Sequence, residues 1–243
     1  MSRKRADLVL VERGFFESRA QAQAAIKAGL VEADGAAVRK PSDMLLPDCA
    51  IRAEAPHPYV SRGGVKLAAA LDAFGFDPKG AICLDLGAST GGFTDVLLQR
   101  GAKRVHAVDV GHGQLHPRIA RDPRVVAMEG TDARALTRAE IPEPVNLLVA
   151  DVSFISVRLV VPPVLPLLAP GARIVLLIKP QFEAGRAALG KGGVVRDESV
   201  QEAVCDEVAR MLADNGVALA GLIESPILGG EGNREFLIGG ARE

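Results

Sequence analysis

The chain of 243 residues has no tryptophan, one tyrosine and only three cysteines. Cys49, Cys83 and Cys205 lie far apart and show neither a disulfide framework nor the spacing of metal ligands, which favours a reducing compartment. Basic and acidic residues nearly cancel, at 29 and 30, and the formal net charge is −1. No global basic field therefore indicates a nucleic-acid partner, and any RNA-binding surface must be a local patch.

Long uninterrupted apolar runs are also missing. The most apolar stretch, residues 159–178, contains Pro162, Pro163, Pro166, Pro170 and Gly171, whereas a membrane-spanning helix needs about 20 consecutive apolar residues. The N-terminus carries basic residues but lacks the apolar core of a signal peptide. With 48% hydrophobic and 24% charged residues, the composition indicates a globular protein, which we expect to be cytoplasmic and without stable membrane association.

Two compositional halves meet near residue 58, so we expect one domain over residues 1–58, linker included, and a second over residues 59–243. In the first half, Ser18 is a suitable N-cap for a helix over residues 19–28, which Gly29 ends. Residues 30–33 then read as a strand that enters a tight turn at Asp34-Gly35.

The second half alternates short apolar runs with helical patterns, which predicts an α/β fold with a mostly parallel sheet and helices on both faces. Helices are expected over residues 64–74, 94–100, 157–168 and 199–215. The last two runs have no helix between them and are expected to pair antiparallel. The seven expected strands cover residues 82–86, 104–108, 125–128, 147–150, 173–178, 218–223 and 236–238.

A glycine-rich loop follows the first of these strands, where ligands of parallel sheets bind. Ser89 stands where a dinucleotide fingerprint needs its second glycine, and no lysine follows Gly92 as in a phosphate-binding loop. S-adenosyl-L-methionine, which has no phosphate, suits the open turn better. Strand-end aspartates are common in ordinary turns, but three at successive strands favour a site for the donor's tail and cation, ribose and adenine. The predicted donor-binding residues are Asp85, Gly87, Ala88, Ser89, Thr90, Gly91, Gly92, Phe93, Asp109, Asp132 and Asp151.

The ends of the fourth and fifth strands carry Asp151 and Lys179. A strand-end lysine is usually a solvated cap, yet this rim of the sheet is where catalytic residues belong. The segment from Asp151 to Phe154 lacks the prolines found at this place in many methyltransferases of base amines. A lysine beside a carboxylate can instead deprotonate an alcohol, which points to a ribose 2′-hydroxyl.

Several motifs carry a family resemblance: YVSRGGVKL at 59–67, LDLGASTGGFTDVLL at 84–98, ADVSFIS at 150–156, IKPQFE at 178–183 and GNREFLI at 232–238. Residues 59–243 resemble the FtsJ-like ribose 2′-O-methyltransferases, and within them the TlyA family of rRNA methyltransferases, also known as hemolysins. The resemblance implies a seven-stranded Rossmann-like sheet and a methyl transfer to rRNA, with cytidine as the expected nucleotide. It also implies a catalytic tetrad of Lys66, Asp151, Lys179 and Glu235, with Glu224 and Glu231 as alternatives for the fourth member.

The first half resembles an α+β S4-type RNA-binding domain, on Ser18-Arg19, Gly29, Asp34-Gly35 and Lys40-Pro41-Ser42. A run of charges is more often a solvated face than an RNA site, and it is the resemblance to the S4 domain that favours an RNA-binding surface here. The partner is then rRNA or a ribosomal subunit, contacted through phosphates. The predicted RNA-binding residues are Arg3, Lys4, Arg5, Arg19, Lys27, Lys40 and Arg62.

Two other functions stay open: a membrane-lytic hemolysin, and an RNA-binding or ribosome-assembly protein without catalytic activity. The intact loop and tetrad argue against the second, and the missing signal and spanning segments against the first. His112 and His116 stand four residues apart without a third ligand candidate, so we expect no metal. We expect the glycine-rich segment 184–195 to form a mobile lid or an RNA-contact loop, with a plain flexible surface loop as a nearly equal alternative.

Overall fold

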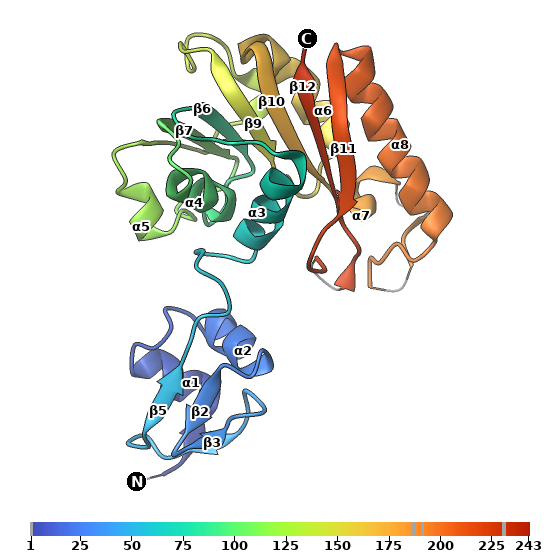
Figure 1. Cartoon of the computed structure of the whole chain (residues 1–243). Helices are drawn as coiled ribbons and strands as arrows, with labels where there is room; N and C mark the ends of the chain where they lie inside the picture. Colours follow the sequence, from blue (N-terminus) through green and yellow to red (C-terminus); the bar gives the residue numbers. More distant parts are fainter. Residues whose placement is uncertain (1, 186–187, 191, 230–231) are drawn as a thin grey trace. The chain divides into compact units, whose positions relative to one another are not determined.

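The computed structural model describes residues 2–185, 188–190, 192–229 and 232–243. The chain forms two compact units, Met1–Pro58 and Tyr59–Glu243, and each has its own apolar core (Figure 1).

The first unit is a small α+β domain. Helices α1 (Ala6–Glu12) and α2 (Arg19–Lys27) share a core with a three-stranded antiparallel sheet of order β3-β2-β5. Ser18 caps α2 as predicted, since its side chain accepts the Gln21 backbone N–H at 3.3 Å. The strands are β1 (Lys4–Arg5), β2 (Val31–Ala33), β3 (Ala36–Ala37), β4 (Met44–Leu45) and β5 (Ile51–Ala53), with β1 and β4 paired separately.

A buried carboxylate organises the helices of this unit. Asp7 is fully buried and accepts two hydrogen bonds from Arg5, at 3.0 Å each, and one from Arg19 at 2.9 Å. Gln23 of α2 donates a further bond at 2.8 Å. The Arg5 guanidinium, with Gln23 and Arg19, holds the pKa of Asp7 well below its usual range. This cluster ties the start of α1 to α2.

The second unit is built on a seven-stranded sheet of order β11-β12-β10-β9-β6-β7-β8. Neighbours from β8 to β10 pair in parallel, and β12 runs antiparallel to both β10 and β11. The predicted fold class and antiparallel last strand are thus confirmed. The strands are β6 (Ile82–Leu86), β7 (Arg104–Asp109), β8 (Val125–Glu129), β9 (Val145–Ala150), β10 (Leu168–Ile178), β11 (Val217–Glu224) and β12 (Phe236–Arg242).

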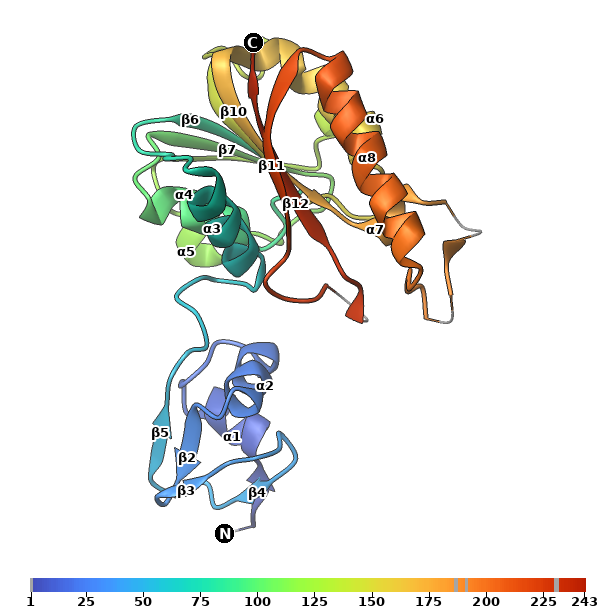
Figure 2. The ribbon, with the colours of Figure 1, turned by 45° about the vertical axis from the view of Figure 1, so that its right-hand side comes forward.

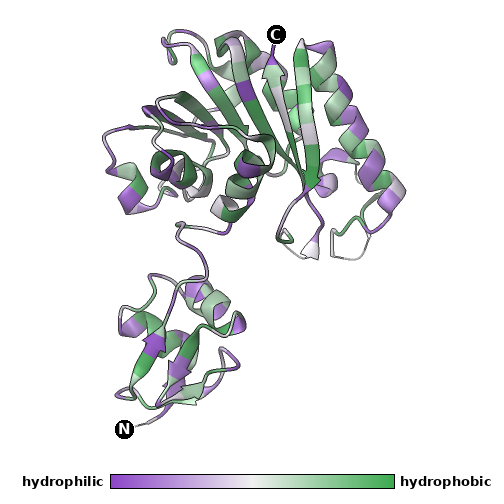
Figure 3. Cartoon of the chain, viewed as in Figure 1, coloured by the Kyte–Doolittle hydropathy of each residue, from purple (hydrophilic) through white to green (hydrophobic). Residues whose placement is uncertain are grey.

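Helices cover both faces of this sheet (Figure 2). One face packs against α3 (Gly63–Phe74), α4 (Gly92–Gln99) and α5 (Pro117–Ala120). The other packs against α6 (Val157–Val164) and α8 (Glu198–Asp214), together with the 3₁₀ turns Ala133–Ala135 and Leu165–Leu167. A short helix, α7 (Pro180–Glu183), follows β10. The apolar residues gather in the strands and the inner helix faces (Figure 3).

Two boundaries differ from the sequence prediction. The helix expected over 157–168 ends at Val164, although it continues through Pro162 and Pro163. A 3₁₀ turn containing Pro166, which has no amide donor to continue the helix, leads into β10. The third strand ends at Glu129, one residue beyond the expected range 125–128, and Asp132 caps the 3₁₀ turn that follows. No helix in the described residues is long and apolar enough to cross a membrane.

One buried polar side chain gives this fold a pH-dependent stability. His106 of β7 is 3% exposed, and neither ring nitrogen has a hydrogen-bond partner within the described parts of the chain. Burial, reinforced by nearby Arg104, lowers the pKa of this imidazole. The unfolded chain, with an ordinary pKa of about 6.5, therefore binds the proton more readily, and stability is lost as the pH falls below that value.

We predict that His106→Leu removes this loss. The difference in unfolding free energy between variant and wild type should grow in favour of the variant between pH 7.5 and 5.5, by at most about 1.4 kcal/mol per pH unit. Urea denaturation at several pH values measures it. Parallel pH profiles for the two proteins would contradict the assignment.

Candidate active site

The loop after β6 turns sharply where a ligand would approach. Gly87 and Gly91 have φ angles of +78° and +90°, and Ser89 also lies in the left-handed region at +46°. The backbone N–H groups of Gly87 and Ala88 both donate to the Val108 carbonyl of β7, at 2.9 and 3.1 Å. A Cβ on Gly87 would lie 2.6 Å from the Asp151 carbonyl oxygen. Glycine is therefore required there for both φ and space.

The other predicted loop residues divide into buried and exposed ones. Ala88, Gly91, Gly92 and Phe93 are buried, and Phe93 belongs to the core beneath α3 and α4. Ser89 and Thr90 are exposed.

Asp85 lies beneath the loop and not on its surface. It is fully buried, and its Oδ2 accepts the Thr94 hydroxyl at 2.7 Å, while Oδ1 has no partner in the described parts of the chain. Burial raises the pKa of Asp85 to about 7, with a smaller contribution from the charge of Asp151. The bond from Thr94 ties the end of β6 to the start of α4, whereas the sequence predicted that Asp85 contacts the tail and cation of the methyl donor.

Asp109, at the end of β7, faces a cavity of about 540 Å³. Its Oδ2 accepts the Ser89 N–H and its Oδ1 the Gly111 N–H, both at 2.8 Å. A carboxylate has about four acceptor positions, so one lone pair on each oxygen stays available to a ligand. Residues lining the cavity include Gly87, Ser89, Val108, Asp109, Val110, Thr131, Asp132, Asp151, Val152, Ser153, Phe154 and Ile155.

Two acidic groups, Glu129 and Asp132, lie at the end of β8 and shortly after it. Asp132 lines the cavity, but its carboxylate pairs with Arg134 at 2.7 Å, which lowers its pKa to about 2. Glu129, which the sequence reading missed, accepts the backbone N–H groups of Gly113, Gln114 and Leu115 at 2.8–3.3 Å. The Glu129 carboxylate thereby holds the loop that follows Asp109. Its position directly after four apolar strand residues was the sequence signal that could have indicated this role.

Lys179 lies beside Asp151, which lines the cavity, and the sequence predicted this neighbourhood. The Lys179 ammonium lies 2.6 Å from Asp151 Oδ1 and donates to the Ser153 hydroxyl at 2.8 Å. Lys179 is 9% exposed, and the ring of Phe182 lies 6.0 Å from its nitrogen. Lys179 is therefore not a solvated strand cap, because its ammonium is buried and contacts Asp151, Ser153 and Phe182.

The other predicted pair is deeply buried. Lys66, in the first turns of α3, forms an ion pair with Glu235 directly before β12, and they are 7% and 2% exposed. Glu224, one of the alternatives, is exposed and pairs with Arg234 at 2.8 Å. Glu231 lies outside the described residues, as do parts of the glycine-rich segment 184–195. Among the described glutamates, the geometry thus favours Glu235.

The two pairs share one edge of the sheet. Ile178 pairs with Phe236, so Lys179 and Glu235 adjoin neighbouring strand ends. A Cβ on Gly63, the first residue of α3, would lie 3.6 Å from Asp151 Oδ2, which brings the start of the Lys66 helix against the same carboxylate.

Two further residues, Phe154 and Glu183, were not predicted as part of the site from the sequence. Phe154 is 91% exposed, has a φ of +65° and stacks on Phe182 with 5.0 Å between ring centroids. Such a conformation is strained in a bulky residue. Glu183, nearly fully buried, accepts the Ser156 hydroxyl and the Val157 N–H and so anchors the start of α6.

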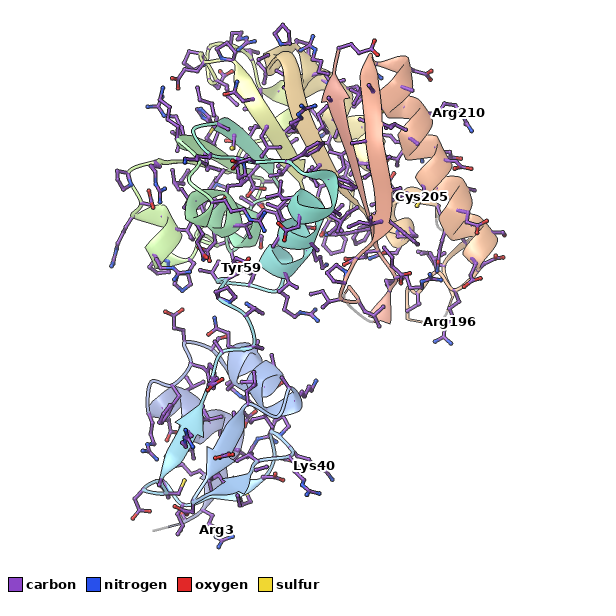
Figure 4. All side chains as sticks on the ribbon, in the orientation of Figure 1. Arg3, Lys40, Tyr59, Arg196, Cys205 and Arg210 are labelled. Atoms are coloured by element: carbon purple, nitrogen blue, oxygen red, sulfur yellow. The ribbon has the colours of Figure 1, made fainter. Side chains whose placement is uncertain are left out.

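The predicted RNA-binding side chains fall into two groups. Arg5 and Arg19 are bound to Asp7, and Lys4 pairs with Glu12 at 2.7 Å. Arg3, Lys27, Lys40 and Arg62 are exposed, and Figure 4 shows Arg3 and Lys40 projecting from the first unit.

The sheet order, the glycine loop after its central strand and the acidic residue ending the next strand define the second unit as an α/β methyltransferase. Residues 59–242 match the FtsJ-like methyltransferase family, and residues 4–48 match the S4 domain. The chain belongs to the FtsJ-like methyltransferase family and, within it, to the TlyA group.

Individual relatives span nearly the whole chain. The 16S/23S rRNA (cytidine-2′-O)-methyltransferase TlyA of Mycobacterium tuberculosis is 44% identical over 97% of this chain and 89% of its own length. Hemolysin A of Brachyspira hyodysenteriae is 40% identical over 96% and 98%. A solved protein of Streptococcus thermophilus, named as a candidate hemolysin, matches with a TM-score of 0.78 and 41% identity, over all of this chain and 89% of its own.

We predict that Gly87→Ala destabilises the second unit more than a positive φ alone would. Gly171→Ala is the matched control, because Gly171 has a φ of +74° with nothing within 4 Å of a Cβ. The control should lose about 1 kcal/mol of unfolding free energy, and Gly87→Ala a further 1–3 kcal/mol or so from the collision with the Asp151 carbonyl. Denaturant unfolding measures both, and equal losses would show that the close approach carries no cost.

Proposed function

We propose that the protein transfers a methyl group from S-adenosyl-L-methionine to a ribose 2′-hydroxyl of rRNA, with a cytidine as the expected nucleotide. The observation that carries the proposal is the ion pair between Lys179 and Asp151, a carboxylate that lines the same cavity as Asp109. A base able to act on an alcohol is thus paired with the wall of the cavity in which Asp109 can hold a ribose.

The lining of the cavity fits the methyl donor. Asp109 keeps acceptor capacity for two ribose hydroxyls, and Gly87 lets the backbone approach a ligand closely. Val110, 71% exposed, offers an apolar wall for a flat base, together with Ile155 and Val152. When bound, the donor supplies an electrophilic methyl carbon.

The chain's own side chains supply the acid–base chemistry. In its neutral amine form, Lys179 takes the proton of the 2′-hydroxyl while that oxygen attacks, and Asp151 stabilises the ammonium that results. The buried ion pair of Lys66 and Glu235 extends the charge network of Lys179 and Asp151 and helps to position the ribose. A retained hydroxyl proton would otherwise leave the oxygen a poor nucleophile.

RNA as the substrate is supported by the first unit and by the mouth of the cavity. The S4 domain presents the exposed Arg3, Lys27 and Lys40 for phosphates. Phe154 presents an exposed ring beside Ser153, suited to stack on an unpaired base. The M. tuberculosis relative is named for cytidine 2′-O-methylation of 16S and 23S rRNA, and we extend this substrate class to the present chain, with a cytoplasmic location.

The expected result in a transfer assay is labelling of at least one RNA substrate. Tritiated S-adenosylmethionine is incubated with free rRNA, each ribosomal subunit and intact ribosomes, and the label is mapped to a 2′-O-methyl nucleoside. Lys179→Ala should lower the rate by about 10²-fold or more, because it removes the base. Exposed Lys103→Ala serves as the control and should retain wild-type rate.

Failure to label any substrate, with donor binding confirmed by calorimetry, would overturn the enzyme assignment. Lysis of erythrocytes by Lys179→Ala at wild-type level, without methylation by the wild-type protein, would instead favour the hemolysin function that the B. hyodysenteriae relative's name carries.

A second prediction concerns the S4 domain. The double variant Lys27→Ala, Lys40→Ala should weaken binding to all RNA sequences and reduce the slope of log affinity against log salt by about 1 per lost phosphate contact. Circular dichroism should show an unchanged fold, whereas Arg5→Ala should destabilise the domain because it removes two of the hydrogen bonds that compensate the buried Asp7 charge. An unchanged salt slope in the double variant would remove these lysines from the RNA interface.

A further inference from the structure

The ammonium of Lys179 is held from two sides by groups of one short segment. Asp151 Oδ1 lies 2.6 Å away, and the Ser153 hydroxyl accepts a hydrogen bond at 2.8 Å. The face of Phe182 lies 6.0 Å off. Since the family tetrad comprises two lysines and two carboxylates, the hydroxyl of Ser153 is a contact that the tetrad does not account for.

Ser153 itself faces the cavity. Its side chain is exposed and contributes to the cavity wall beside Asp151. The next residue, Phe154, has a φ of +65°, which marks a strained turn in the backbone at this point. Strain of this kind persists only where the surrounding structure holds it.

The contact with Ser153 can fix the direction of the lone pair on the Lys179 nitrogen, because of the number of hydrogen atoms that this nitrogen carries. A neutral amine has two N–H donors and one lone pair, and an ammonium has three donors. If the two donors of the neutral amine face Asp151 and Ser153, the lone pair points in the remaining direction. With only Asp151 as a partner, the amine can rotate about its C–N bond, and its lone pair then points toward the substrate for only part of the time.

We propose that Ser153 is a positioning residue that orients the lone pair of Lys179 toward the ribose 2′-hydroxyl. In the step it serves, the O–H bond breaks and its proton joins the lysine nitrogen. The oxygen forms the bond to the methyl carbon, and the electron pair of the carbon–sulfur bond stays on sulfur. This role rests on the proposed function, because it presupposes an alcohol acceptor.

The segment does not need the serine hydroxyl for its fold. The Asp151 N–H donates to the Leu86 carbonyl at 2.9 Å, and Glu183 anchors the start of α6 through the Val157 N–H at 2.8 Å. Both anchors persist in a Ser153→Ala variant, so removal of the hydroxyl changes the surroundings of the lysine while the backbone stays in place.

The test compares full-length Ser153→Ala and Ser153→Thr with wild type and with Ser199→Ala, a serine exposed at the start of α8. Single-turnover methylation is measured with saturating S-adenosylmethionine and saturating rRNA substrate between pH 6 and 10. Ser153→Ala should be slower by about tenfold, equivalent to about 1.4 kcal/mol, while Ser153→Thr, which keeps the acceptor, and Ser199→Ala stay within about threefold of wild type. The affinity for S-adenosylhomocysteine, measured by calorimetry, should be unchanged in all variants.

The pH profile separates orientation from a general structural effect. A hydroxyl that accepts from an ammonium favours the charged form, so its loss should move the rising limb of the Ser153→Ala profile to lower pH. A Ser153→Ala rate within about twofold of wild type, an unshifted limb, or a Ser153→Thr rate as low as that of Ser153→Ala would each overturn the proposal. Inactive wild-type protein would instead refute the proposed function, which the same assay detects first.

Discussion

The site depends on the register of the central strands. In parallel strands the carboxyl ends meet at one edge, and here Ala150 of β9 pairs with both Leu86 of β6 and Leu176 of β10. The residues that continue these strands are therefore the glycine loop, Asp151 and the segment reaching Lys179. Antiparallel β12 then delivers its first residues to the same edge from the opposite direction. A shift of one residue in any of these pairings would turn the reactive side chains away from one another.

The ion pair of Lys66 and Glu235 is costly for the fold. Removing two charges from water costs several kcal/mol for each ion, and their mutual attraction often fails to offset it. Both side chains are less than 10% exposed. Stability alone therefore gives little reason for the pair, which agrees with its proposed part in the reaction.

Much of this architecture could be predicted from the sequence, because apolar runs and glycine turns are local signals. The strand β6 and the cap Ser18 were predicted at their observed positions. Burial of Lys66 could not be derived from its own helix, which reads as amphipathic with a surface lysine, and only the family motif indicated it. Ser153 and Glu129 were missed for a related reason. Their roles arise from contacts between segments distant in sequence or from a strained backbone, and neither leaves a periodic pattern.

The proposed donor side and acceptor side of the site are built differently, the first mainly from backbone groups and the second mainly from side chains. On the donor side, backbone geometry dominates: Gly87 allows close approach, and Asp109 holds the loop through backbone N–H groups of Ser89 and Gly111. On the acceptor side, side chains dominate, with a lysine held between a carboxylate and a hydroxyl. A backbone cradle suits any reaction that uses the same donor, whereas the acceptor's chemistry depends on which side chains stand at the fourth and fifth strand ends. The glycine loop therefore indicates the class of enzyme, and the surroundings of Lys179 support the proposal that an alcohol is the group it methylates.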